Sequence, residues 1–319
     1  MITQNGKSLG GDGRFVIANA ETMKREKVIE GGSMLDKDIW PQHLVVINDN
    51  KAYVRYSTSN MEQNSGIRIL DLKAGSLSSE DIKGTYGKFT IKGSTKIRMV
   101  YTNNHVFAPC GHSLAIIDAT ADTIVKRIEL GSQIKGIVKG HDGNIWMTVA
   151  GKFTGSFYQP TYTSQSRVVG IDVNSYAIIK DYSLGEGFNF PVATWTPSIG
   201  MCASFNEDVL FFWNGPFNSN DVYRFDYING KMTHLLNIKN EPDNIGNTIY
   251  GYLGVDKNNR LYVGCTNYMW TKMVVFNAKT GKRIDITDKK MDNDDTEGFD
   301  NYYFNGAGSP SGVDFTYRF

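Results

Sequence analysis

The sequence predicts an all-β fold, a single β-propeller domain over residues 1–319 that is built from four-stranded blades. Three observations lead to this prediction. One strand–turn–strand segment recurs along the whole chain, a second kind of hairpin lies between its copies, and Asn, Asp and Gly occupy the turns. The composition agrees, because 40% hydrophobic residues in a chain of 319 are enough for a sizeable core.

The first kind of hairpin has alternating apolar residues, then Asp or Asn, then a polar turn and a second extended run. The residues that open these turns are Asn19, Asp71, Asp118, Asp172, Asp226 and Asn277. Their separations are 52, 47, 54, 54 and 51 residues, as expected for a repeat architecture. An Asx side chain closes such a turn by accepting a hydrogen bond from the backbone two residues further on. We therefore interpret all six as structural.

The second kind of hairpin lies between the first and has an Asn-, Asp- or Gly-rich turn, as tight hairpins require. Its copies span residues 44–54, 97–107, 137–147, 201–212 and 253–263. Each second strand carries an aromatic residue at an equivalent place: Tyr53, Phe107, Trp146, Phe211 and Tyr262. Periodic aromatic residues on small sheets predict packing between neighbouring blades.

Two hairpins in each repeat give a count of six four-stranded blades. The sixth blade would combine the two ends of the chain, with residues 312–319 as its first strand and residues 1–4 as its second. Pairing of these ends would close the ring without leaving an exposed sheet edge. Seven blades are the alternative, if the chain is truncated or one repeat is too degenerate to recognise.

Three segments resemble the YVTN-type repeat of bacterial propellers: residues 225–231 (FDYINGK), 276–282 (FNAKTGK) and 259–264 (NRLYVG). Over almost its full length the chain resembles the exported, often lipid-anchored propellers on the surface of Gram-negative gut bacteria. One branch of that group captures vitamin B12 above a TonB-dependent outer-membrane transporter. The resemblance implies a seven-bladed ring and a location at the cell surface or in the periplasm. It also implies a lipid anchor in the full precursor and a cobalamin-like nutrient or an outer-membrane transporter as partner.

The long connections between hairpins are expected on one face of the disc, because in a four-stranded meander they all emerge on the same side. Loops on a rigid scaffold commonly carry function. The aromatic residues in or beside these connections are Trp40, Phe153, Phe157, Tyr158, Tyr162, Phe188, Phe190, Trp195, Trp213, Phe217, Tyr268, Trp270, Phe299, Tyr302, Tyr303 and Phe304. Six of these aromatic residues lie beside strand ends, and we predict that they bind the ligand: Trp40, Tyr158, Trp195, Trp213, Tyr268 and Trp270. The alternative for each ring is that it anchors its own loop.

Charge and targeting signals limit the partners and the cellular locations that this protein can have. The formal net charge is +1, with both signs interspersed, which argues against a nucleic-acid partner. No apolar run is long enough to span a bilayer. Residues 1–6 have no signal-peptide features and resemble a chain that enters in mid-strand, so we expect that a leader has been removed from an exported precursor. Cys110, Cys202 and Cys265 are expected as buried thiols on strands.

Motifs for catalysis are absent from the sequence. The five histidines have no metal-ligand spacing, residues 6–8 lack the context of a phosphate-binding loop, and no nucleophile elbow occurs. The acidic segment 292–300 is interpreted as a solvated loop, with a loop-ordering Ca²⁺ as the alternative.

We therefore predict a non-enzymatic monomer that needs no metal or organic cofactor. It would bind a nutrient or a protein partner through its aromatic loop face. The alternatives are a metal-dependent propeller hydrolase or dehydrogenase with its site in the central funnel, and a structural surface-layer or adhesion protein.

Overall fold

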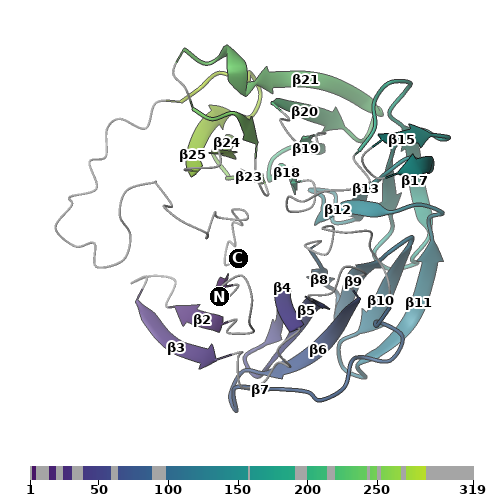
Figure 1. Ribbon diagram of the computed structural model, residues 1–319, viewed down its shortest axis with the longest axis vertical. Helices are drawn as coiled ribbons and strands as arrows, with labels where there is room; N and C mark the ends of the chain where they lie inside the picture. Colours follow the sequence, from purple (N-terminus) through teal and green to yellow (C-terminus); the bar gives the residue numbers. More distant parts are fainter. Residues whose placement is uncertain are drawn as a thin grey trace.

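The strands form sheets that stand radially around a central axis, as in a β-propeller (Figure 1). The computed structural model describes residues 2–4, 14–18, 24–30, 39–58, 64–87, 98–156, 159–190, 200–213, 220–242, 245–249, 253–266 and 271–284. Within these residues the chain is almost entirely strand and turn, and the 3-10 helix η2 (Ile238–Asn240) is short. The predicted all-β propeller is confirmed.

Five sheets have four strands each. Blade 1 contains β4 (Ile39–Asn48), β5 (Lys51–Thr58), β6 (Ser65–Asp71) and β7 (Ser76–Leu77). Blade 2 contains β8 (Val100–Thr102), β9 (His105–Cys110), β10 (Ser113–Asp118) and β11 (Thr123–Glu129). Blade 3 contains β12 (Ile134–Lys139), β13 (Ile145–Val149), β16 (Arg167–Ile171) and β17 (Ile178–Ser183).

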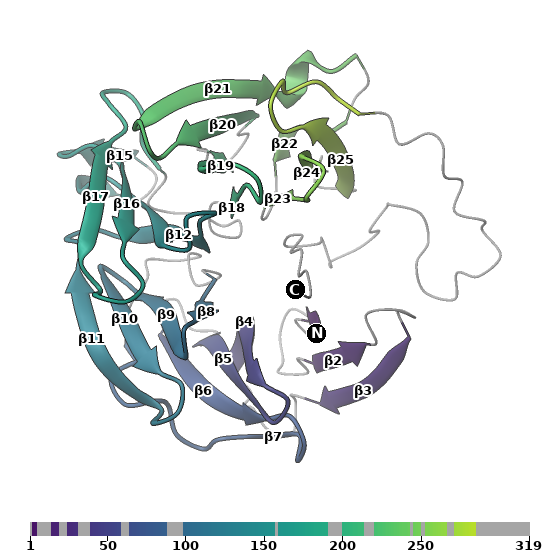
Figure 2. The ribbon, with the colours of Figure 1, turned by 180° about the vertical axis from the view of Figure 1, so that it is seen from behind.

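Blade 4 contains β18 (Met201–Ala203), β19 (Val209–Trp213), β20 (Asp221–Asp226) and β21 (Lys231–Asn237). Blade 5 contains β22 (Thr248–Ile249), β23 (Gly254–Val255), β24 (Arg260–Thr266) and β25 (Thr271–Asn277), with β22 and β23 both paired to β24. A separate hairpin, β14 (Phe153–Ser156) and β15 (Gln159–Tyr162), is inserted between β13 and β16. All strand pairs are antiparallel, and blades 1 to 4 are meanders that extend outward from the axis (Figure 2).

The predicted count of six four-stranded blades is not supported, because the described residues form five. The N-terminal sheet has three strands: β1 (Ile2–Gln4), β2 (Arg14–Ala18) and β3 (Arg25–Glu30). Residues 312–319, which were expected to provide a fourth strand and close the ring, lie outside the described residues. The seven-bladed alternative is not supported either.

The Asx turns are confirmed in all five blades. In blade 1 the Asp71 carboxylate accepts hydrogen bonds from the backbone N–H groups of Lys73 (2.9 Å) and Ala74 (2.7 Å). Asp118, Asp172, Asp226 and Asn277 accept the corresponding pair of bonds in the other blades. These side chains satisfy backbone donors at the turn that follows β6, β10, β16, β20 and β25, which explains why Asp or Asn recurs there. Asn19 lies outside the described residues.

Each boundary between successive sheets contains its own hydrophobic cluster. Tyr53 of blade 1 packs in a cluster with Val106 of blade 2. Phe107 of blade 2 shares a cluster with Met147 of blade 3, and Trp146 of blade 3 shares the next with blade 4. Of the predicted interblade aromatic series, Tyr53, Phe107, Trp146 and Phe211 are at most 1% exposed, whereas Tyr262 is only half-buried. Burial of each large ring contributes roughly 1.5–3 kcal/mol, so these clusters hold the blades together.

The three cysteines are buried free thiols on β9, β18 and β24, as predicted. Cys202 and Cys265 belong to the cluster between blades 4 and 5.

Polar contacts join the blades on the face that carries the tight turns, here called the short-turn face (residues 49–50, 72–75, 103–104, 119–122, 140–144, 172–177, 204–208, 227–230, 256–259 and 278–281). The contacts in order are Lys27 Nζ to Leu72 O (3.0 Å), Lys51 Nζ to Asp122 Oδ1 (2.9 Å), Asn103 Nδ2 to Asn174 Oδ1 (3.1 Å), Asp142 N to Tyr227 Oη (3.2 Å) and Asn206 Nδ2 to Asn259 Oδ1 (3.2 Å). Every boundary from the N-terminal sheet to blade 5 therefore has such a bridge.

Candidate functional site

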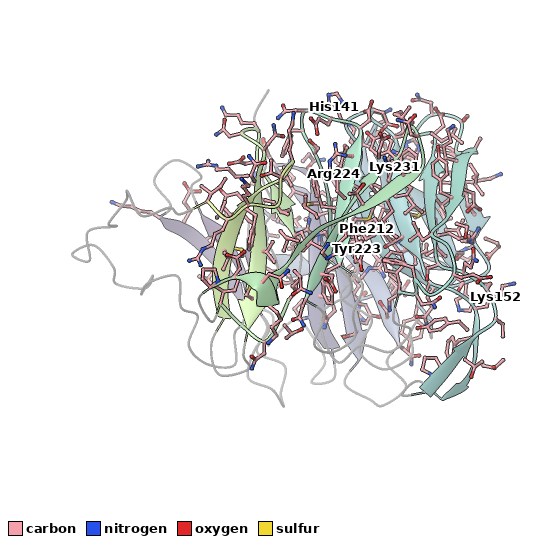
Figure 3. All side chains as sticks on the ribbon, turned by 90° about the horizontal axis from the view of Figure 1, so that it is seen from above. His141, Lys152, Phe212, Tyr223, Arg224 and Lys231 are labelled. Atoms are coloured by element: carbon pink, nitrogen blue, oxygen red, sulfur yellow. The ribbon has the colours of Figure 1, made fainter. Side chains whose placement is uncertain are left out.

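A pocket of about 530 Å³ opens at the boundary of blades 2 and 3, at the strand ends opposite the short-turn face. Its lining residues are Leu130, Gly131, Ser132, Ala150, Lys152, Ser164, Gln165, Arg167 and Ser183. Figure 3 shows Lys152 at the opposite end of the molecule from His141, which belongs to the short-turn face. The pocket thus lies on the face where the sequence placed the long connections, here called the long-loop face. Its size is in the range of small-molecule sites.

Arg167 forms one wall of the pocket and is fixed by two acceptors. Its Nη1 donates to the carboxylate of Asp181 on the neighbouring strand β17, and its Nη2 donates to the carbonyl oxygen of Leu130 at 2.6 Å. Leu130 directly follows β11, so the guanidinium group joins blade 3 to the end of blade 2. The Arg167 side chain is 29% exposed. The cation is therefore positioned in advance and remains accessible to solvent.

Lys152 supplies a second cation from the segment between β13 and β14. It is exposed, and its Cε and Nζ lie 3.6 and 3.8 Å from the point where a Cβ on Gly131 would stand. Gly131 has a φ of +72°, a conformation that favours glycine. Because glycine has no Cβ, the Lys152 side chain can lie close to the connection between blades 2 and 3. Lys152 forms no ion pair with any residue that the structure describes.

The remaining polar groups of the lining are fixed by one another. Ser164 Oγ accepts a hydrogen bond from the backbone N–H of Lys152 at 2.8 Å. Ser183 Oγ donates to Oε1 of Gln165, and the Gln165 amide NH₂ makes no bond to a described residue. A Cβ at Gly151 would lie 2.1 Å from the carbonyl oxygen of Ser164, so only glycine allows these two segments to meet. The pocket consequently has a defined shape.

Buried polar groups lie on the inner strand of the same blade. The N–H of Ala150 donates to the carbonyl oxygen of Gln133 at 2.8 Å, which places Gln133 next to the pocket lining. Gln133 Oε1 and Lys135 Nζ are buried without a hydrogen-bond partner. Lys135 is the extra residue of a β-bulge between Ile134 and Gly136 and is 0% exposed. Burial lowers its pKa from 10.5 to about 7.

A second group of basic side chains lies on blade 1 and beside blade 2. The His43 imidazole accepts a hydrogen bond through Nδ1 from the N–H of Met99 at 3.2 Å. Burial, with the charges of Arg98 and Arg55, lowers the pKa of His43 to about 3. Arg55 is 2% exposed, and its Nη2 donates to the carbonyl oxygen of Pro109 at 2.6 Å. His43 is thus neutral at physiological pH, and these groups join blade 1 to blade 2.

The predicted ligand-binding residues fall into three groups. The prediction that Trp213 binds the ligand is wrong. Trp213 is the last residue of β19, is 1% exposed and packs in the cluster between blades 4 and 5. Trp40 lies on β4, opposite Ser57 of β5. Tyr158, Trp195, Tyr268 and Trp270 lie outside the described residues, as do residues 292–300. Their predicted contacts with a ligand stay predictions.

Other aromatic residues expected on the long-loop face are packed instead. Phe188 and Phe190 are 7% and 0% exposed and meet edge to face, with ring centroids 5.3 Å apart. Tyr162 and Phe153, from the inserted hairpin β14–β15, pack against the same cluster, and Tyr162 Oη donates to the carbonyl oxygen of Phe190 at 3.2 Å. Where the structure describes these rings, they anchor loops, which was the alternative that the sequence left open.

Sequence reasoning did not find Lys152, Arg167 or Lys135. The long connection 151–165 was recognised, and it contains part of the lining, but single Lys and Arg residues next to a strand carry no motif. Among the described residues, no group of three His, Cys, Asp or Glu side chains is placed to hold a metal ion. No helix in the described part of the chain is long and apolar enough to cross a membrane.

Radial antiparallel sheets around an axis, with a pocket at the long-loop face that carries two cationic side chains, define this protein as a β-propeller with a candidate ligand site. The chain belongs to the family described as "Domain of unknown function (DUF5074)", whose model matches residues 1–307. No curated protein matches the chain.

Solved structures similar to this one are distant in sequence. Kuenenia stuttgartiensis hydrazine synthase has a TM-score of 0.54 and 14% identity, covering 82% of this chain and 70% of that one. The WD40 repeats of RRP9 have a TM-score of 0.50 and 8% identity, covering 88% and 67%. The extracellular domain of the putative one-component system BT4673 from B. thetaiotaomicron has a TM-score of 0.47 and 10% identity, and covers 77% of this chain and 27% of that one. At these identities the likeness concerns the fold alone.

Proposed function

We propose that this propeller is a non-enzymatic binding protein that takes up its ligand at the long-loop face. The observation that carries the proposal is the pocket of about 530 Å³ between blades 2 and 3, in which hydrogen bonds hold Arg167, Ser164 and Ser183 in place beside the exposed Lys152. Ligand sites of this size usually have a largely pre-formed shape with a few oriented polar groups. The short-turn face, in contrast, uses its described polar side chains to join neighbouring blades.

The wider proposal includes the aromatic residues of the same face and the location of the protein. Tyr158 and Trp195 belong to long connections, whereas Tyr268 and Trp270 belong to the four-residue connection between β24 and β25. Large rigid rings bury much area at a small entropic cost. Export to the cell surface or periplasm, with a lipid anchor in the precursor, is implied by the family resemblance. A nutrient-like ligand or a transporter as partner is likewise implied by the family resemblance. A lipobox cysteine in the gene's leader would support this location, and a leaderless gene would contradict it.

The test is calorimetric titration of the purified protein with small polar nutrients, including cobalamin, and with a TonB-dependent outer-membrane transporter from the same organism. Saturable binding of one ligand, lost in a Lys152→Met variant or in the Trp195→Ala/Trp270→Ala double variant, supports the proposal. Thermal unfolding of each variant controls for loss of the fold. Turnover of a lactone or ester, together with stoichiometric metal in the purified protein, would overturn the non-enzymatic assignment.

A further inference from the structure

The hydrogen-bonding capacity of the pocket between blades 2 and 3 is strongly unequal. Two acceptors of the lining are engaged by its own donors: the carbonyl oxygen of Leu130 receives Arg167, which also donates to Asp181 beside the lining, and Gln165 Oε1 receives Ser183. Its donors are largely unengaged within the described residues. The ammonium group of Lys152 and the NH₂ group of Gln165 make no bond to a described residue.

Arg167 and Ser164 add further donors to the same lining. A guanidinium group has five N–H donors. The bonds to Asp181 and to Leu130 use one N–H each, which leaves three N–H groups for a ligand or water. Ser164 Oγ accepts from the N–H of Lys152, so its O–H is still available as a donor. The complementary ligand must therefore be rich in acceptors.

The charge of the lining has one sign. Lys152 and Arg167 are cations, and none of the nine lining residues is Asp or Glu. The neighbouring Asp181 offsets one positive charge through its ion pair with Arg167, whereas Lys152 has no counter-ion among the described residues. Charge-assisted hydrogen bonds from ammonium or guanidinium to an oxyanion are about twice as strong as neutral ones.

We propose that the pocket formed by Lys152, Gln165, Arg167 and the three serines binds a small organic oxyanion of about the size of a sugar. This inference rests on the proposed function and specifies the chemical class of its ligand. The anionic group, a carboxylate or a phosphate ester, lies against Lys152 and Arg167, and acceptor oxygens of the ligand meet Gln165 NH₂ and Ser164 O–H. The volume of about 530 Å³ accommodates one such molecule.

The experiment is calorimetric titration of the full chain at low ionic strength with glucuronate, glucose 6-phosphate, glucose, acetate and inorganic phosphate. We expect glucuronate or glucose 6-phosphate, or both, to bind at least about tenfold more tightly than glucose, because only the charged sugars form charge-assisted hydrogen bonds with Lys152 and Arg167. Weaker binding of acetate and inorganic phosphate would show that the acceptor oxygens contribute. Added salt should weaken binding of the charged ligands only.

Three variants locate the site. Lys152→Met should reduce affinity for the charged ligand about tenfold while Lys152→Arg keeps it. Gln165→Glu keeps the acceptor for Ser183 but replaces the NH₂ donor with a negative charge, so binding should be lost. Lys126→Met, an exposed change on β11 outside the lining, is the matched control and should leave affinity unchanged.

Equal affinity for glucose and glucuronate, equal effects of Lys152→Met and Lys126→Met, or no binding of either charged sugar would overturn the inference. Specific binding of a neutral nutrient or a protein partner at the long-loop face, combined with one of those results, would leave the proposed function intact. The two failures are therefore distinguishable.

Discussion

The Lys51 ammonium group of blade 1 donates a hydrogen bond of 2.9 Å to the Asp122 carboxylate of blade 2. Asp122 lies in a turn and has a φ of +54°. The equivalent turn residue in three other blades is glycine: Gly75, Gly230 and Gly281. The left-handed conformation costs a residue other than glycine roughly 1–3 kcal/mol. Asp122 compensates by also accepting a hydrogen bond from the Tyr53 hydroxyl of blade 1. A strained turn residue thus holds two blades together.

Replacement of Asp122 should separate backbone strain from interblade bonding. Asp122→Ala should lower the free energy of unfolding by about 2 kcal/mol, because it leaves the Tyr53 hydroxyl without its acceptor and keeps the unfavourable φ. Asp122→Gly should be about 1 kcal/mol less harmful, since glycine accepts this φ without strain. Urea denaturation measures both changes.

A Tyr53→Phe background provides the control for this prediction. Once the hydroxyl is gone, Asp122→Ala should cost clearly less than in the wild type, because no buried donor is left unpaired. Equal costs of Asp122→Ala in the two backgrounds, or a glycine variant less stable than the alanine variant, would contradict the explanation.

Gly170→Ala should destabilise blade 3 through its contact with Trp146. A Cβ at position 170 would lie 2.8 Å from two carbons of the indole ring, which is also stacked on Tyr227 with centroids 4.3 Å apart. Overpacking of this kind costs about 1–3 kcal/mol, and Trp146→Ala should cost about 3–5 kcal/mol by leaving a cavity. Thermal unfolding with circular dichroism measures both.

The double variant Gly170→Ala/Trp146→Ala decides whether these two effects share one contact. The added methyl group then occupies part of the cavity, so the double variant should be more stable than the sum of the single changes implies. Strict additivity would show that Gly170 is required for another reason.

Trp213→Ala should reduce stability about as strongly as Trp146→Ala, since both indoles are 1% exposed and such truncations cost about 3–5 kcal/mol. Trp195→Ala and Trp270→Ala, predicted on the long-loop face, should leave the melting temperature within a few degrees. Differential scanning calorimetry of the three variants makes the comparison. A mild effect of Trp213→Ala would contradict its place in the core between blades 4 and 5.

The repeat was predictable because the residues that build a blade act locally. Each Asx side chain bonds backbone groups two and three residues further on, so a single turn contains the whole signal. The interblade rings could be predicted for the same reason, since they occupy one position of a recurring hairpin. The number of blades was not predictable in this way, because the sixth blade depended on pairing of residues 1–4 with residues 312–319 at the other end of the chain, a contact that no local pattern marks.

Exposure at strand ends was the weak point of the sequence prediction. All five residues of β19 are buried, because neighbouring strands flank it within the sheet and neighbouring blades cover both faces of that sheet. The place of Trp213 beside a loop therefore says nothing about its exposure. The pocket depends on still longer-range contacts: Arg167 meets Leu130 only because blade 3 packs on blade 2. No local pattern marks such a pair.

Lys135 should make the stability of the fold depend on pH in the neutral to alkaline range. Burial lowers its pKa from 10.5 to about 7, so between these values the unfolded chain takes up a proton that the folded chain does not. Stability from this group is complete above pH 10.5, decreases as the pH falls toward 7 and is constant below 7. The full difference is on the order of 5 kcal/mol.

A Lys135→Met variant tests this directly, because it keeps an unbranched side chain and removes the titrating amine. The variant should be more stable than the wild type at pH 7, and the difference should shrink as the pH rises to 10. Urea denaturation across this range gives the difference, with the exposed Lys126→Met variant as the control that should show no such trend. Packing changes alone would shift stability equally at every pH, so a difference that does not vary with pH would contradict the assignment of a neutral buried amine to Lys135.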